Sequence, residues 1–215
     1  AGASYVLATM AEQQGHTYVP RDVLLVEAAR LLAVEEDVAA TGLQRAVEDG
    51  TAVIDSAAEE PLVYPTDLYR AECDVAEIIA GMTSGSGLPT LPPQALARGR
   101  NWTMLNEAQQ TAVLNVFQHP ISIITGGPGV GKTTVTREIV AIARGLNWNV
   151  ALAAPTGRAA KRLSESSQSH AQTIHRLLKW EPELSGFAHN DGNPLKHHLV
   201  IIDEVSMLDI SLAAS

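Results

Sequence analysis

Cysteine is nearly absent from this chain, since Cys73 is the only one in 215 residues. A single thiol cannot form an internal disulfide, so the chain is not a disulfide-stabilised secreted domain, and we expect it in a reducing compartment, the cytoplasm. Histidines with further metal ligands at a suitable spacing are absent too. His197 and His198 have no Cys or His partners at metal-ligand spacing, which argues against a zinc site.

Long apolar runs are also missing. No apolar segment approaches about 18 residues, the length that a membrane-spanning helix needs, so we expect no membrane partner. No signal peptide is visible. The chain begins with Ala1 rather than Met, which suggests a processed chain or a segment excised from a longer protein.

Basic residues are scarce, 15 against 24 acidic ones, which gives a formal net charge of −9. The deficit lies in residues 1–80, which carry four Arg and fifteen Asp or Glu, whereas residues 81–215 have a net charge of +2. A uniformly basic nucleic-acid-binding protein is therefore excluded. The second part could still hold a phosphate backbone locally.

Residues 1–82 read as a small, mainly helical module. We expect helices over residues 5–14, 20–32, 36–48 and 66–81, and short β-runs at 51–54 and 62–64. Helices followed by a short hairpin are typical of a winged-helix-like domain. Such domains often bind DNA, but the third helix offers only Arg45 against Glu48 and Asp49. The acidity favours a scaffolding or partner-binding role instead.

A Gly-, Ser- and Pro-rich linker is expected over residues 83–100, with the domain boundary there. Beyond it, residues 101–215 alternate between helical and strand patterns. The expected elements are helix 106–117, strand 121–125, helix 132–144, strand 149–154, helices 157–166 and 172–179, and strand 198–203. This alternation predicts an α/β domain with a mainly parallel sheet.

A glycine-rich loop between a β-run and a helix is the most informative stretch. It fits the P-loop spacing G-x-x-x-x-G-K-[ST], with Gly126, Gly131, Lys132 and Thr133 at the fixed positions. Backbone N–H groups can wrap a polyphosphate only where no side chain blocks the approach. We therefore expect nucleotide contacts from Gly127, Pro128, Gly129, Val130, Gly131, Lys132, Thr133 and Thr134. Lys132 would reach the β- and γ-phosphates, and the Thr133 hydroxyl would bind Mg²⁺.

A second chemical centre follows the apolar run Leu199–Ile202, which is typical of a strand buried on both faces. The run ends in Asp203 and Glu204. Ligands of open parallel sheets bind at the carboxyl ends of the strands, where the glycine loop also lies. We expect Asp203 to hold the Mg²⁺ of a bound nucleotide and Glu204 to orient and deprotonate the attacking water.

Taken together, these motifs resemble the first motor domain of superfamily-one DNA helicases, and most closely the RecD-type helicases. The glycine loop is similar to the first motif of that family, and Asp203–Asp209 to its acidic motif. Further similar stretches are Leu105–Val113 with Gln109 at the glutamine position, Ala154–Leu163, Thr173–Leu178, and Gly186-Phe187 with Asn190 and Asn193-Pro194-Leu195, which fit a hairpin.

The resemblance implies a RecA-like P-loop motor domain over residues 101–215, C-terminally incomplete. It implies an ATP-hydrolysing helicase that moves 5′ to 3′ on single-stranded DNA, enters at a 5′ overhang and acts in repair or recombination. Gln109 would contact the adenine. Thr156, Gly157, Arg158, Thr173 and His175 would contact the DNA strand. For Arg158 the alternative is a solvated helix position, and for His175 a packed, hydrogen-bonded side chain.

The family's later motifs and its second motor domain do not occur in this sequence, so we expect it to be a segment of a longer protein. Two other functions stay open. One is an ATP-binding switch module without helicase activity, which would need neither the glutamine motif nor the segment 156–158. The other is the helicase half of a conjugative relaxase, which would need an upstream tyrosine nucleophile and a histidine metal cluster that residues 1–80 do not show. Protein partners are not predicted.

Overall fold

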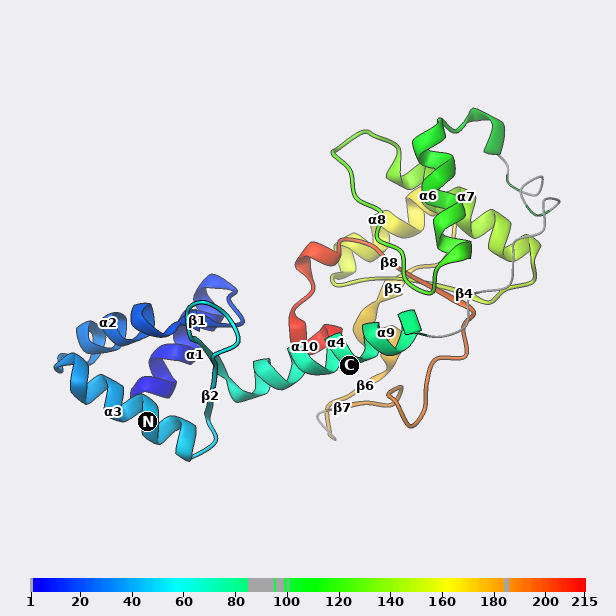
Figure 1. The fold of residues 1–215 in the computed structure, drawn as a ribbon. Coiled ribbons are helices and arrows are strands. Elements are labelled where there is room, and N and C mark those ends of the chain that lie inside the picture. Colours follow the sequence, from blue (N-terminus) through cyan, green and yellow to red (C-terminus); the bar gives the residue numbers. More distant parts are fainter. Residues whose placement is uncertain (1, 85–94, 96–98, 100, 184–185) are drawn as a thin grey trace. The chain divides into compact units, whose positions relative to one another are not determined.

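The computed structural model describes residues 2–84, 95, 99, 101–183 and 186–215, and its chain divides into two compact units (Figure 1). The first unit extends from the N-terminus to Ile78 and includes Asp209–Ala214. The second comprises Ile79–Leu208 with Ser215. Each unit has its own hydrophobic core and is described separately.

Up to Ile78, the first unit contains three helices, a three-stranded antiparallel sheet and the start of a fourth helix. Its elements are α1 (Gly2–Gln14), β1 (Val19–Pro20), α2 (Arg21–Leu32), α3 (Glu36–Glu48), β2 (Ala52–Asp55), β3 (Leu62–Pro65) and α4 (Thr66–Ser84). The strand order is β1-β3-β2, with Val63 opposite both Val19 and Ile54. The winged-helix-like order predicted from the sequence is thereby confirmed; the two-residue strand β1 was not predicted.

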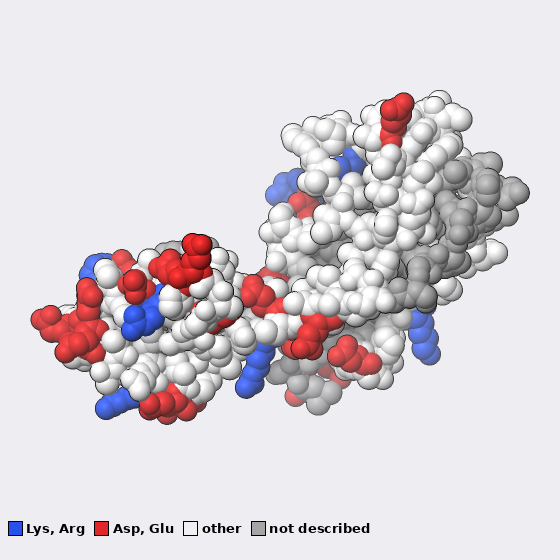
Figure 2. All heavy atoms as spheres, viewed as in Figure 1, with Lys and Arg blue, Asp and Glu red and all other residues white. Residues whose placement is uncertain are grey.

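The core of this unit is aliphatic, with Val6, Leu24 and Val63 fully buried. Its surface is strongly acidic. Figure 2 shows Asp and Glu side chains spread over the body that holds α2 and α3. The helix α4 continues past the predicted end at residue 81 to Ser84, so Thr83 and Ser84, predicted as linker, are helical. Most of the predicted linker 83–100 lies outside the described residues.

The second unit is an α/β arrangement around a parallel sheet with the order β5-β4-β8. Its elements are the 3₁₀ turn η1 (Trp102–Met104), α6 (Glu107–Gln118), α7 (Lys132–Gly145), β4 (Val150–Ala154), α8 (Gly157–Ser167), β5 (Gln172–Thr173), α9 (Ile174–Leu178), β6 (Trp180–Glu181), β7 (Gly186–Phe187), β8 (Leu199–Ile202) and η2 (Val205–Met207). The short α10 (Ile210–Ala213) follows and groups with the first unit. The predicted fold class, a P-loop α/β domain with a parallel sheet, is confirmed.

Helix α7 is the central helix of this unit. One side packs against α6, where Val113 and Phe117 meet Val135 and Ile139 in a buried cluster. The other side contributes Val140 to a cluster with Leu152 of β4 and Leu163 of α8. The apolar spacing predicted for helix 132–144 therefore serves two partners at once.

The strand predicted at 121–125 is not formed, and that prediction was wrong. Residues 122–127 are irregular, and the side chain of Ile123 is 90% exposed. A β-branched run becomes a strand only when a neighbouring strand supplies ladder partners. The strands of the described parallel sheet pair in the order β5-β4-β8, and none of them forms a ladder with this run.

The helix predicted over 172–179 is also partly wrong. Gln172 and Thr173 form β5, which pairs in parallel with Ala153 and Ala154, and the helix is only α9. Thr173 is extended, and its hydroxyl accepts a hydrogen bond from the Arg176 N–H at 3.2 Å. A Thr that caps a helix in this way ends the preceding strand and starts the helix.

The hairpin region predicted from Gly186-Phe187 contains β7, which pairs with β6. Trp180 and Phe187 lie across this pair with ring centroids 4.8 Å apart.

Of the residues described, none belongs to a helix that is long and apolar enough to cross a membrane.

Candidate functional site

The glycine loop owes its shape to glycines in the left-handed region. Gly129 has φ +78° and Gly131 φ +89°, and Gly131 is the N-cap of α7. A Cβ built on Gly127 or Gly129 would meet no atom within 4 Å. The backbone there therefore borders open space. A loop of this kind leaves its N–H groups accessible to an anion.

Lys132 is the first residue of α7, and its ammonium lies over the loop. It donates hydrogen bonds to the carbonyl oxygens of Gly126 and Gly127, the latter at 2.9 Å. The N–H groups of Thr134 and Val135 donate to the Gly131 carbonyl. Those of Lys132 and Thr133 precede the helical ladder and have no acceptor within it. This helix end is electropositive and suited to phosphate.

Gln109 lies against the same loop. Its Nε2 donates to the Val130 carbonyl at 3.0 Å, and a Cβ built on Gly131 would lie 2.6 Å from that Nε2. Its Oε1 accepts from the Asn106 N–H at 3.1 Å, while the Gln109 N–H donates to Asn106 Oδ1 at 2.9 Å. This reciprocal pair is a capping box at the start of α6.

The carboxyl edge of the sheet carries the acidic pair. The Asp203 N–H donates to the Ala153 carbonyl at 3.0 Å, which continues the β4–β8 ladder, and Asp203 Oδ1 accepts from the Glu204 N–H at 3.0 Å. Glu204 is in the left-handed region with φ +56°. Both side chains are exposed. A turn directly after the strand thus presents two carboxylates at the edge.

The glycine loop belongs to the same edge as Asp203. Helix α7 is joined to β4 by the short loop 146–149 and packs on it through Val140 and Leu152. A helix so connected runs antiparallel to the strand, so its N-terminus lies at the strand's carboxyl end. No hydrogen bond or ion pair joins the side chains of Lys132 and Asp203 directly.

The residues predicted to contact DNA divide between two neighbouring strand ends. Thr156 caps α8, its hydroxyl accepting from the Ala159 N–H at 3.2 Å, and Thr173 caps α9. Ala154 is paired with Thr173, so these caps share one edge. Each hydroxyl keeps its own proton for donation. Gly157 and Arg158 are exposed on the first turn of α8, and Arg158 forms no ion pair within the described ranges.

His175 lies in the first turn of α9, two residues after the cap Thr173, and beside the hairpin. Its ring centroid is 6.1 Å from that of Trp180 and 5.6 Å from that of Phe187. Trp180 is 42% exposed, so it is not a core residue. His175 is itself exposed and contacts these two aromatic rings, so its role in DNA binding stays a prediction.

The side chains present fit Mg²⁺ with a nucleotide. Thr133 contributes a hydroxyl, and Asp203 and Glu204 contribute carboxylates, which are the oxygen ligands that Mg²⁺ prefers. Lys132 and the N-terminus of α7 supply positive charge for phosphate. No group of three or more His, Cys, Asp or Glu side chains placed to hold a metal occurs within the described part of the chain. A bound Mg²⁺ would then need oxygens from the nucleotide as well.

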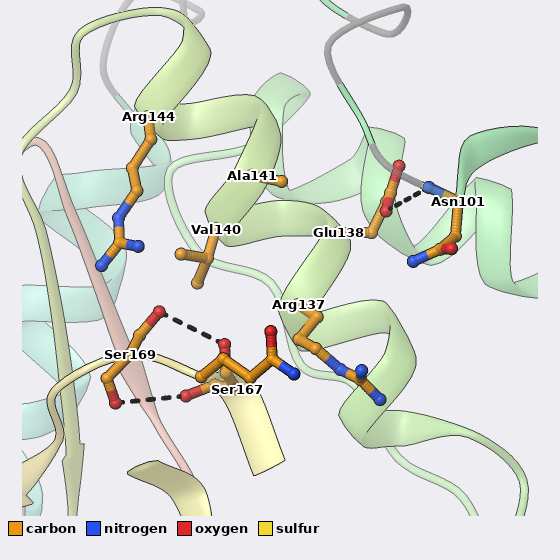
Figure 3. A pocket seen from close by; sticks show the side chains of 9 residues that line it. Asn101, Arg137, Glu138, Val140, Ala141, Arg144, Ser167 and Ser169 are labelled. Carbon is orange, nitrogen blue, oxygen red and sulfur yellow. Dashed lines mark hydrogen bonds between the residues drawn. The ribbon is translucent and has the colours of Figure 1, made fainter. Parts of the chain in front are cut away.

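Two features of this region were not predicted. Asn106 caps α6, although the pattern Asn-x-x-Gln before an apolar run was visible in the sequence. Glu138 on α7 is fully buried, which nothing in the sequence indicated. A polar cavity of about 410 Å³ lies along α7 and is lined by Glu138, Arg137, Arg144 and Ser169 among others (Figure 3). The residues lining it include none of those predicted to bind nucleotide, metal or DNA.

Comparison with known proteins adds a family to this geometry. The sequence profile described as an AAA domain matches residues 109–215. The ATP-dependent RecD2 DNA helicase of Deinococcus radiodurans is 32% identical over 231 aligned residues, covering 100% of this chain and 31% of the relative.

Two RecBCD enzyme subunits named RecD are similar as well. The subunit of Mycolicibacterium smegmatis is 35% identical over 177 residues, covering 71% of this chain and 31% of the relative. That of Haemophilus influenzae is 35% identical over 130 residues, covering 49% of this chain and 20% of the relative. The chain thus spans about a third or less of the length of the relatives it matches.

Proposed function

This chain belongs to the RecD-type helicase family, and we propose that it forms the ATP-binding part of an enzyme that couples ATP hydrolysis to movement along single-stranded DNA. Its second unit supplies the P-loop and the acidic edge. The names of the relatives, a DNA helicase and subunits of RecBCD, support DNA repair or recombination as the setting. In this proposal the protein acts on DNA in the cytoplasm.

The observation that carries this proposal is the placement of Lys132. Its ammonium lies over a loop with two left-handed glycines, at the N-terminus of the 14-residue helix α7. We propose that it leaves the carbonyls of Gly126 and Gly127 to bind the β- and γ-phosphates. The N–H groups of Gly127, Gly129, Gly131, Lys132 and Thr133 would surround the same phosphates, with Pro128 and Val130 shaping the loop and Thr134 beside them in the first turn of α7.

The acidic edge would supply the hydrolytic step. Thr133 and Asp203 would hold Mg²⁺ together with the nucleotide, and the ion would supply positive charge to offset that of the transferring phosphate. Glu204 is free to accept a proton from water and to orient it, since its exposed side chain follows the strand end directly. Gln109, already against the loop, would use its remaining amide proton and lone pair to hold adenine.

The DNA strand would lie along the caps of α8 and α9. Thr156 and Thr173 donate their hydroxyl protons to phosphates, and Gly157 and Arg158 add an N–H group and a guanidinium. His175 would contribute from the side of the hairpin. Movement from 5′ to 3′ and entry at a 5′ overhang rest on the family resemblance.

The test of this proposal uses the complete protein and Lys132→Ala. Nucleotide affinity is measured with a fluorescent ATP analogue, and ATP hydrolysis with and without single-stranded DNA. We expect DNA to stimulate hydrolysis and Lys132→Ala to reduce turnover to less than about a tenth, because the phosphate charge loses its main cationic partner. Lys161→Ala, an exposed change on α8, is the matched control.

Retention of wild-type turnover by Lys132→Ala, with an unchanged melting curve, would contradict the phosphate role. Hydrolysis that DNA does not stimulate would instead favour a nucleotide switch. Unwinding of duplexes with 5′ and 3′ overhangs, compared in one assay, tests the direction of movement.

A further inference from the structure

Glu138 is buried in a way that packing alone does not explain. Its side chain is 0% exposed, and it is the only acidic or basic residue classed as buried in the described part of the chain. Its Oε2 accepts a hydrogen bond from the Asn101 N–H at 3.0 Å (Figure 3). Its Oε1 is buried without a partner among the described residues. An apolar side chain of similar volume would cost less here, so the one bond to Asn101 needs a reason.

That bond fixes the start of the segment that leads into α6. The Asn101 carbonyl accepts from the Met104 N–H at 2.8 Å, which closes the turn η1. Gln110 holds the same segment from the other side, its Nε2 donating to the carbonyls of Trp102 and Leu105, both at 3.2 Å. The segment 101–105 is therefore held between a side chain of α7 and one of α6.

This segment ends where the capping box begins. Asn106 follows directly, and it exchanges two hydrogen bonds with Gln109. Gln109 then reaches the Val130 carbonyl in the glycine loop, which leads back into α7. A closed path of contacts thus runs from Glu138 through Asn101, Asn106 and Gln109 to the loop before Lys132. Glu138 and Gln110 are thus the two anchors of the segment that leads into this capping box.

We propose that Glu138 and Gln110 are positioning residues that set nucleotide-base selectivity by fixing the Gln109 amide beside the glycine loop. This inference rests on the proposed role of Gln109 in holding adenine. An amide that reads both a donor and an acceptor on a base must be held to within about 0.5 Å. Release of the segment 101–105 would leave phosphate binding by Lys132 intact and would loosen the choice of base.

The experiment measures the dissociation constants of ATP and GTP for the complete protein, and their ratio. Glu138→Met keeps the volume and removes the acceptor, whereas Glu138→Gln keeps an acceptor oxygen for Asn101. We expect Glu138→Met to lower the preference for ATP about fivefold, the worth of one average hydrogen bond, and Glu138→Gln to retain it. Glu165→Met, an exposed change on α8, is the matched control.

A double-mutant cycle with Gln109→Ala shows whether Glu138 acts through Gln109. Gln109→Ala alone should lower the ATP preference, and adding Glu138→Met should lower it no further. If Gln109→Ala lowers the preference but Glu138→Met does not, this inference is overturned while the adenine role of Gln109 stands. If Gln109→Ala leaves the preference unchanged, the adenine role fails and the inference with it.

Loss of the fold in Glu138→Met would be detected by thermal melting. Gln110→Met then tests the same segment from its other anchor, since Gln110 is only partly buried. It should reduce the ATP preference with the affinity for inorganic triphosphate unchanged. A variant that melts earlier but keeps the wild-type ratio would show a purely structural role and would refute the proposal.

Discussion

At the scale of single residues, the two carboxylates after β8 are adjacent but not equivalent. Asp203 is tied into the sheet, because its N–H bonds to Ala153 and its Oδ1 accepts the Glu204 N–H. Glu204 occupies the left-handed region and its side chain has no such tie in the described contacts. A fixed carboxylate suits a metal ligand, and a freer one suits a proton acceptor.

Glu204→Gln should therefore keep Mg²⁺-ATP binding and stop hydrolysis, since it removes the base and preserves the shape. Asp203→Asn should weaken the Mg²⁺-dependent part of nucleotide affinity itself. Both changes are checked by titration with a fluorescent ATP analogue, with and without Mg²⁺, and by phosphate release. Equal affinities together with equal residual rates in the two variants would contradict the division of roles.

Tyr64 makes a second residue-scale prediction, in the first unit. Burial, with the neighbouring Glu72 as the next cause, raises the pKa of Tyr64 from 10.0 to about 12. Between these values the unfolded chain has lost the phenolic proton and the folded chain still holds it. The free energy of unfolding should then fall as pH rises through this window, and its contribution is complete below pH 10.

Thermal melting from pH 9 to 12 checks this expectation. Tyr64→Phe should flatten the decline, whereas Tyr5→Phe, at a residue 69% exposed, should leave it unchanged. Tyr69 lies 5.2 Å from Tyr64 by ring centroids, and Cys73 beside it also raises the pKa of Tyr69. A decline that survives Tyr64→Phe in full would assign the effect to other groups.

At the scale of elements, the N-terminus of α8 is the part of the DNA proposal most open to test. Arg158 stands on its first turn, two residues after the cap Thr156, and Arg162 lies one helical turn further along the same helix. Both side chains are exposed. Arg158 and Arg162 thus carry the same charge and differ in their position on the helix.

Arg158→Ala should weaken binding of single-stranded DNA similarly for all sequences, because a backbone contact carries no base information. It should also reduce the slope of log affinity against log salt by about 0.7, the value per phosphate contact on a single strand. A salt titration with a mixed-sequence oligonucleotide measures this. Arg162→Ala is the control, and an equal loss in both variants would point to general charge instead.

Sequence predicted the helices better than the strands, and the reason is physical. Helices 36–48 and 132–144 were predicted almost to their ends because apolar periodicity is a local signal. The strand at 121–125 failed because pairing depends on a distant neighbour. The loop residues Gly129 and Gly131 were predictable from spacing, whereas the Gln109–Val130 contact needed two helices to pack first. The burial of Glu138 left no local signal at all.

At the scale of the whole molecule, charge divides between the two parts of the chain. Residues 1–80 carry a net charge of −11 and residues 81–215 one of +2. A phosphate backbone is repelled by the first and tolerated by the second. The confirmed winged-helix-like order therefore does not by itself make the first unit a DNA-binding module, and a partner with basic groups fits its surface better.

The open side of β8 has a practical consequence. Among the described residues only β4 pairs with this strand, and Val200 and Ile202 are each 38% exposed. An unpaired edge with apolar side chains is a template on which another chain can add a strand, and the β-branched run at 121–125, with Ile123 90% exposed, is a second segment of that kind. Purified samples of this chain should thus lose solubility by intermolecular strand addition, at a rate that rises with protein concentration.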